Sequence, residues 1–220
     1  MEVGETMTFD EYLVRWSTLH GDAVATLPIR LWLRATYTIA LPFRWLHPNV
    51  ITLLGLAVAF ATVAFDFRFS LASLTLSFVI LALGVVDSLD GIVATLTNRN
   101  SAFGAFLDSL VDRAIDVAIA LLFLHHGAPL GAVLVIICLT LLHEYMRARA
   151  MGLGMTEVGI ITVGEKPMRI AIGVMFFLAC AVLPKHSTSL ISIAVYVWSA
   201  LAVIACVQLF VTIKRRLSFA

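Results

Sequence analysis

The sequence predicts an all-α polytopic membrane protein, with six transmembrane helices preceded by N-terminal amphipathic, interfacial helices. Of the 220 residues, 61% are hydrophobic and only 13% are charged, and the mean hydropathy is +1.00. Such a composition excludes an ordinary soluble domain and indicates several membrane spans. The net charge of +1 argues against a nucleic-acid partner, because nucleic-acid binding usually requires a strongly basic surface.

Residues 1–47 are predicted to form helices that lie at the membrane surface. Thr8 and Glu11 have the spacing of a capping box, and the apolar residues that follow them fall at helical intervals. This pattern is typical of a short helix on the membrane, and packing on the protein's own body is an equal alternative.

The second N-terminal segment, residues 27–46, is long enough to span a membrane but carries Arg30, Arg34 and Arg44 close to one helical face. An interfacial helix accommodates three arginines, whereas a lipid-exposed span does not. We therefore expect a domain boundary between residues 1–47 and a transmembrane domain over 48–220.

Six apolar segments follow, at approximately 50–66, 70–95, 103–124, 130–148, 168–184 and 188–212. Each is near the length of about 20 residues that a transmembrane helix requires. Six spans place both termini on one side of the membrane. That side would also hold most of the basic residues, namely Arg30, Arg34, Arg44, Arg99, Arg147, Arg149, Lys166, Arg169, Lys214, Arg215 and Arg216. The positive-inside tendency then predicts a cell-membrane protein with cytoplasmic termini.

The most informative stretch runs from Asp87 to Asp112 and carries four carboxylates between apolar segments. Asp87 and Asp90 are three residues apart, and Asp108 and Asp112 are four apart, so each pair occupies one face of a helix. A polar break at residues 98–101 predicts a helical hairpin that presents the two pairs to each other. Unpaired at a bilayer centre, four acids would cost about 10 kcal/mol. Bound Mg²⁺ or Mn²⁺ would offset this cost and suit oxygen-only ligands, and two carboxylate pairs predict two ions.

Two carboxylate pairs that hold two metal ions are suited to phosphoryl transfer, because such ions bridge and polarise the phosphoryl group. One carboxylate can instead take the proton from an attacking hydroxyl group. Gly91, Ala94 and Gly104 remove side-chain bulk beside the acids, where a nucleotide or diphosphate would approach. Tight helix–helix packing is the alternative explanation for these small residues.

The ordered set resembles the signature of the CDP-alcohol phosphotransferase family, with every gap matching: Asp87, Asp90-Gly91, Ala94, Gly104, Asp108 and Asp112. Thr95 departs from it, since the family has an arginine there that helps to hold the nucleotide's phosphates. Arg99, one turn later, would replace that arginine if the turn folds back. The resemblance extends from about Pro48 to Arg169.

The resemblance implies a phospholipid-synthesising enzyme that moves a phosphatidyl-type group from a CDP-lipid such as CDP-diacylglycerol to an alcohol, releasing CMP. In its terms Asp87, Asp90, Asp108 and Asp112 bind metal, and Asp112 is also the general base on the acceptor hydroxyl. CDP-lipid contacts are expected at Asn49, Thr52, Gly91, Ala94, Ser101 and Gly104. Residues 48–220 would be the catalytic domain, with its site on the cytoplasmic side. Dimers are common in the family, so a homodimer is a further expectation.

The acceptor is predicted from two basic stretches, Tyr145–Ala150 and Glu165–Arg169, which are similar to those of phosphatidylinositol-phosphate and archaetidylinositol-phosphate synthases. The resemblance implies inositol phosphate as the acceptor, with its phosphate held by Arg147, Arg149, Lys166 and Arg169. Basic residues at one helix end and at the next helix start are suited to forming an anion pocket. The alternative is that they snorkel to the interface and set topology.

Three other functions compete with this hypothesis. The same family includes enzymes with other acceptors, such as glycerol phosphate, phosphatidylglycerol or serine. The replacement of the family arginine by Thr95 suggests a second alternative, a family member that binds the nucleotide lipid but does not turn it over. From a different class, an ion- or proton-coupled transporter would also carry intramembrane acids. A transporter predicts acids spread through the membrane depth and internal repeats, whereas the acids here cluster at one predicted depth and the two halves show no repeat.

Overall fold

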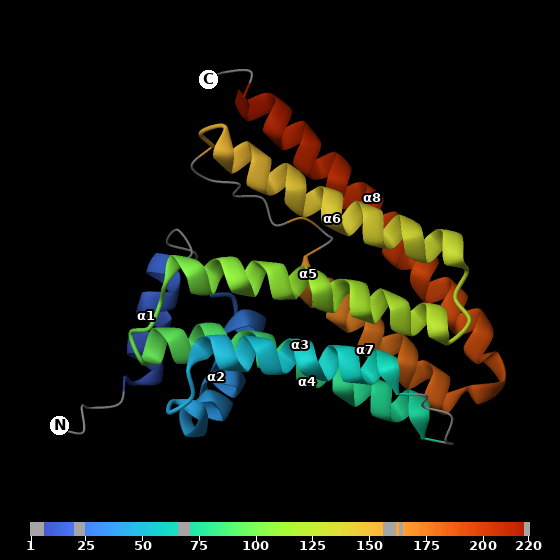
Figure 1. Ribbon diagram of the computed structural model, residues 1–220, viewed down its shortest axis with the longest axis horizontal. Helices are drawn as coiled ribbons and strands as arrows, with labels where there is room; N and C mark the ends of the chain where they lie inside the picture. The colour runs from blue at the N-terminus through green and yellow to red at the C-terminus, as the bar shows by residue number, and fades with distance from the viewer. Residues whose placement is uncertain (1–6, 20–24, 66–70, 156–161, 163–164, 218–220) are drawn as a thin grey trace. The chain divides into compact units, whose positions relative to one another are not determined.

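The structure, a computed structural model, describes residues 7–19, 25–65, 71–155, 162 and 165–217. Helices account for all the regular secondary structure of these ranges, which contain no strand (Figure 1). The predicted all-α class is therefore confirmed. The helices form two compact units: unit 1 comprises the described residues within 1–57 and 83–112, and unit 2 those within 58–82 and 113–220.

Every apolar segment that the sequence predicts corresponds to one helix. The six helices are α3 (Pro48–Ala64), α4 (Ala72–Leu96), α5 (Ala102–His125), α6 (Leu130–Gly152), α7 (Lys166–Val182) and α8 (Ser187–Leu217), the last preceded by a short 3₁₀ helix, η2 (Pro184–His186). The predicted segment ends at residues 66 and 70 lie outside the described residues.

Three of the described helices are long and apolar enough to cross a membrane: α4, α6, and α8 together with η2. The number is four if the bent pair Ile29–Phe43 and Pro48–Ala64, whose axes differ by 107°, is one span. Helices α3 and α7 have only 17 residues each, short of the roughly 20 that cross the hydrocarbon core. Helix α5 carries four charged residues, Asp108, Asp112, Arg113 and Asp116. The count of six spans remains a prediction.

Unit 1 contains the two N-terminal helices, α1 (Phe9–Leu19) and α2 (Leu27–Ala40), with the 3₁₀ turn η1 (Leu41–Phe43). The predicted capping box is present: the Thr8 amide donates to Glu11 Oε2 at 2.7 Å, and the Glu11 amide donates to Thr8 Oγ1 at 3.4 Å. The hydrogen bonds from Thr8 lower the pKa of the Glu11 carboxyl below its ordinary value.

The apolar face of α1 packs on the body of unit 1. Tyr12 is only 3% exposed and shares a core with Leu33 and Tyr37 of α2 and with Leu89 and Ile92 of α4. Of the two arrangements expected for this helix, packing on the protein itself is therefore present. The predicted domain boundary between residues 47 and 48 stays a prediction, and described residues on both sides of it belong to unit 1.

Unit 2 is built around α6 and α8, which lie side by side (Figure 1). The Ser199 hydroxyl and the Cys206 thiol of α8 both donate to backbone carbonyls of α6, at 3.4 Å each. Where α7 approaches α4, Gly173 leaves room for a neighbour, since a Cβ there would lie 3.0 Å from the Ile80 side chain. Absence of bulk at Gly173 thus permits close helix packing.

Candidate metal and nucleotide-lipid site

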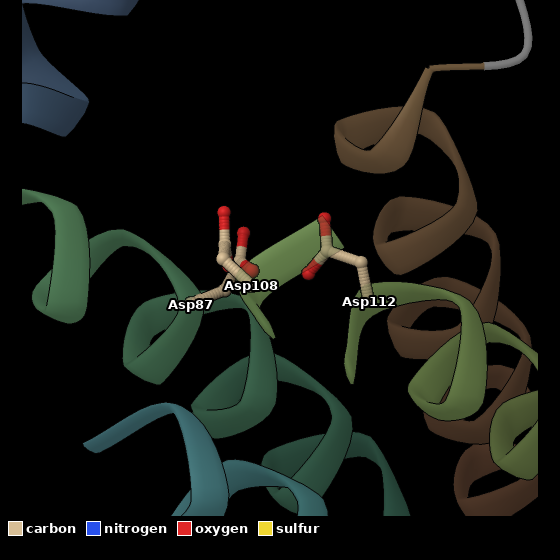
Figure 2. Close-up of side chains that lie close together, drawn as sticks. All are labelled: Asp87, Asp108 and Asp112. Atoms are coloured by element: carbon tan, nitrogen blue, oxygen red, sulfur yellow. The ribbon is translucent and has the colours of Figure 1, made fainter. Parts of the chain in front are cut away.

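Three carboxylates from two helices meet in unit 1. Asp87 comes from α4, whereas Asp108 and Asp112 come from α5, and one oxygen of each lies within 4.8 Å of the others. Figure 2 shows the carboxylates of Asp87 and Asp108 next to each other, with that of Asp112 facing them. All three side chains are half-buried. Carboxylate oxygens at this separation match the ligand preference of Mg²⁺ and Mn²⁺, so the donor set fits the predicted divalent metal.

The turn between α4 and α5 produces this convergence. Asn98 has a left-handed backbone, with φ of 54°, and the Arg99 amide donates to the Ala94 carbonyl at 2.9 Å. Asparagine tolerates this conformation and so terminates α4. Ser101 then begins α5 as an N-cap, because its Oγ accepts the Gly104 amide at 3.0 Å. The predicted helical hairpin is therefore present.

Asp90, the fourth predicted metal ligand, lies outside the three-carboxylate group and is buried, with 6% exposure. Its Oδ2 accepts a 2.6 Å hydrogen bond from the Thr52 hydroxyl of α3, and its Oδ1 accepts one from the Gly91 amide at 2.7 Å. Thr52, predicted as a CDP-lipid contact, thus orients an aspartate of the motif. The metal-binding role of Asp90 stays a prediction.

A cavity of about 480 Å³, called cavity 1, is lined by every residue that was predicted to contact the CDP-lipid. Its wall includes Asn49, Thr52, Gly91, Ala94, Ser101 and Gly104, together with Asp90 and Asp108. A Cβ on Gly104 would lie 3.0 Å from Ser101 Oγ and 3.2 Å from Asn49 Oδ1, whereas one on Gly91 would meet nothing within 4 Å. The backbone at Gly91 is consequently bare toward open space, which favours close approach of a ligand.

A second cavity of about 340 Å³, called cavity 2, is lined by all four aspartates of the motif: Asp87, Asp90, Asp108 and Asp112. The N-terminal helices line it as well, through Tyr12, Trp16 and Leu19 of α1 and Leu33 of α2. Sequence reasoning missed this contribution. The helical spacing of α1 shows that the helix has an apolar face, but it carries no information on which surface that face covers.

Thr95, the departure from the family motif, is buried at 5% exposure and donates its hydroxyl to the Gly91 carbonyl at 2.9 Å. Its side chain therefore makes a bond within its own helix. Arg99 lines cavity 1 and places Nη1 3.5 Å from the Leu46 carbonyl. The chain does fold back at Asn98, as the proposed replacement of the family arginine by Arg99 requires.

The four residues predicted to hold the acceptor's phosphate belong to unit 2, where Arg147 and Arg169 contact carboxylates. Arg147 Nη2 lies 2.7 Å from Glu165 Oε1, and Arg169 Nε lies 3.2 Å from Asp116 Oδ1. Arg149 is exposed and Lys166 is half-exposed. Partial burial raises the pKa of Glu165, but the hydrogen bond and charge of Arg147, with hydrogen bonds from Thr162, hold it below its ordinary value. The acceptor role of these residues stays a prediction.

Asp116 is the centre of a charged cluster in unit 2. Only 3% of its side chain is exposed, and it lies 3.4 Å from Arg113 Nε as well as 3.2 Å from Arg169 Nε. Arg113 in turn donates to Glu144 at 2.9 Å. Because a buried charge is costly without a partner, these contacts explain how a charged residue is tolerated on an apolar helix.

Comparison with known proteins assigns the chain to a family. Residues 45–213 match the family model for CDP-alcohol phosphatidyltransferase. Archaetidylinositol phosphate synthase of Pyrococcus horikoshii is 33% identical over 179 residues, which cover 77% of this chain and 85% of that relative.

Two crystal structures of Mycobacterium tuberculosis phosphatidylinositol phosphate synthase have a similar fold. The structure with CDP-DAG bound has a TM-score of 0.63 and 24% identity, covering 82% of this chain and 94% of the other. The complex with manganese and citrate has a TM-score of 0.64 and 25% identity, covering 81% of this chain and 88% of the other. These structures share the fold, whereas the family model over residues 45–213 and the 33% identical relative confirm the predicted enzyme class, a transferase of phospholipid biosynthesis: the chain belongs to the CDP-alcohol phosphatidyltransferase family.

Proposed function

We propose that the protein transfers a phosphatidyl-type group from CDP-diacylglycerol to inositol phosphate, with release of CMP and with Mg²⁺ or Mn²⁺ as cofactor. The observation that carries the proposal is the arrangement of unit 1. All six residues expected to contact the CDP-lipid line cavity 1, which shares Asp90 and Asp108 with the aspartate-lined cavity 2. A nucleotide diphosphate in cavity 1 would therefore have its phosphates beside the carboxylates.

In the proposed reaction, the acceptor hydroxyl attacks the phosphorus on the lipid side of the diphosphate. The new P–O bond joins the acceptor to the phosphatidyl group, the P–O bond to CMP breaks, and Asp112 takes the hydroxyl proton. Asp87, Asp90, Asp108 and Asp112 would hold the divalent metal, which when bound neutralises charge on the diphosphate and on the departing CMP. Thr52 keeps Asp90 oriented through its 2.6 Å hydrogen bond.

Inositol phosphate is favoured as the acceptor because the two similar proteins described above are an archaetidylinositol phosphate synthase and a phosphatidylinositol phosphate synthase. We assign its phosphate to Arg147, Arg149, Lys166 and Arg169, since guanidinium groups bind phosphate through several hydrogen bonds. The pairing of Arg147 with Glu165 and of Arg169 with Asp116 would orient these two groups for an anion. Glycerol phosphate, phosphatidylglycerol and serine are the other acceptors that the family allows.

We further propose six spans, with both termini and the site at the cytoplasmic face of the cell membrane, and a homodimer as the assembly. The six helices α3 to α8 support the count, and the distribution of basic residues supports the orientation. The family match removes the basis for the transporter hypothesis, because intramembrane acids are explained by the family's transferase motif.

The proposal is tested by measuring CMP release from CDP-diacylglycerol by the purified protein in detergent, with Mg²⁺ or Mn²⁺ and one acceptor at a time. We expect release to require both a divalent ion and inositol phosphate, and EDTA to abolish it. Faster release with glycerol phosphate, phosphatidylglycerol or serine would reassign the acceptor. Binding of CDP-diacylglycerol, with no CMP released from it in the presence of any of these acceptors, would contradict the enzyme and favour a binding protein.

A further inference from the structure

Helix α1 forms part of the wall around the catalytic carboxylates, although it lies outside the residues that match the family model. The family match begins at residue 45, whereas α1 spans Phe9–Leu19. Three of its residues nevertheless line cavity 2 with the four aspartates: Tyr12, Trp16 and Leu19. The wall that α1 adds is aromatic and aliphatic, opposite in character to the carboxylates it faces.

This wall is firmly attached to unit 1. Tyr12 is buried against Tyr37, with ring centroids 5.6 Å apart, and the Tyr37 hydroxyl donates to the carbonyl of Met7, two residues before α1 begins. At the other side, Arg15 Nη2 donates to Asn98 Oδ1 at 2.6 Å. Asn98 is the left-handed residue that turns α4 into α5. Helix α1 is thus bound to the same turn that brings the aspartates together.

The chemistry of the proposed reaction gives this wall a role. Water can attack the lipid-side phosphorus in place of the alcohol: the P–O bond to CMP breaks, a P–O bond to the water oxygen forms, and one proton leaves the water for the base. The products would be phosphatidic acid and CMP, so the CDP-lipid would be consumed without transfer. Closing a site with apolar side chains expels water and suppresses such side reactions.

We propose that α1 is a water-excluding wall of the catalytic cavity, which directs the phosphatidyl group to the alcohol rather than to water. Trp16 is the central residue, because it has the largest side chain among the three residues that α1 contributes to the lining of cavity 2. Leu19 extends the wall, since it lines both cavities. This inference rests on the proposed function, and it identifies a specificity-determining element of the same site.

The test compares two products, the transfer product and phosphatidic acid, formed from CDP-diacylglycerol with and without inositol phosphate. In the wild type, CMP release should require the acceptor. For Trp16→Ala we expect the ratio of hydrolysis to transfer to rise by roughly tenfold, equivalent to a change of about 1.4 kcal/mol between the two barriers. Leu19→Ala, a change at a 58% exposed side chain that leaves the core intact, should raise the ratio in the same direction.

Two control variants distinguish a wall from a merely structural helix. Val14→Ala shortens a 69% exposed residue of α1 that does not line either cavity, and should leave the ratio unchanged. Trp16→Phe keeps an aromatic ring at the wall and should stay near the wild-type ratio. An unchanged ratio in both Trp16→Ala and Leu19→Ala, even with slower transfer, would overturn the proposal. Absence of CMP release from the wild type with every acceptor would instead overturn the proposed function, and this inference with it.

Discussion

Asp112→Asn is expected to lower the rate of CMP release by roughly 10²–10⁴-fold, the usual contribution of a positioned general base. The amide keeps the shape of the carboxylate but can neither take the acceptor's proton nor contribute its charge to the group formed with Asp87 and Asp108. Binding of the CDP-lipid should remain measurable, because the predicted lipid contacts lie in cavity 1, whose wall does not include Asp112. The two quantities are measured as single-turnover CMP release and as equilibrium binding of CDP-diacylglycerol.

Ser109→Ala provides a control for changes to α5 itself, since Ser109 is exposed and lines neither cavity. It should have wild-type kinetics. Wild-type turnover in Asp112→Asn would remove Asp112 as the base, whereas equal loss of lipid binding and turnover would indicate that the substitution disrupts the hairpin rather than the chemistry.

Asp116→Asn is expected to reduce the free energy of unfolding by about 3–5 kcal/mol, the cost of removing one partner from a buried ion pair. Asp116 is almost completely buried and lies within 3.4 Å of two guanidinium groups. The neutral amide would leave both positive charges without this compensation in an apolar environment. Denaturant or thermal unfolding of the protein in detergent measures the change.

The matched control is Asp10→Asn, the same chemical change in an exposed ion pair. Asp10 and Arg30 lie 3.6 Å apart with side chains 85% and 56% exposed, and such pairs contribute about 0–1 kcal/mol. Equal effects of the two substitutions would show that Asp116 is solvated or adequately stabilised without Arg113 and Arg169.

The aspartate motif could be predicted from the sequence because its geometry is local. Spacings of three and four residues determine a helix face, and the polar break before Ser101 indicates the turn, so the convergence of Asp87, Asp108 and Asp112 follows from one hairpin. The six apolar segments are local features in the same sense, and each corresponds to one helix.

The features that sequence reasoning missed depend on contacts between distant residues. The hydrogen bond from Thr52 to Asp90 joins residues 38 positions apart, and that from Arg15 to Asn98 joins residues 83 apart. Nothing in the spacing of α1 predicts that Trp16 lines the carboxylate cavity. Asp116 shares a helix with Asp112, but its pairing with Arg169 depends on the packing of α7, which no local pattern encodes.

The central claim is that carboxylates from α4 and α5 jointly bind a divalent cation, and titration of the purified protein with Mn²⁺ tests it most directly. Electron paramagnetic resonance reports the free ion, so bound Mn²⁺ is obtained by difference, without any substrate. We predict saturable binding to the wild type, weakened in both Asp87→Asn and Asp108→Asn by at least the roughly 10–100-fold that loss of an outer-shell partner costs. Identical titration curves for the wild type and both variants would contradict the account.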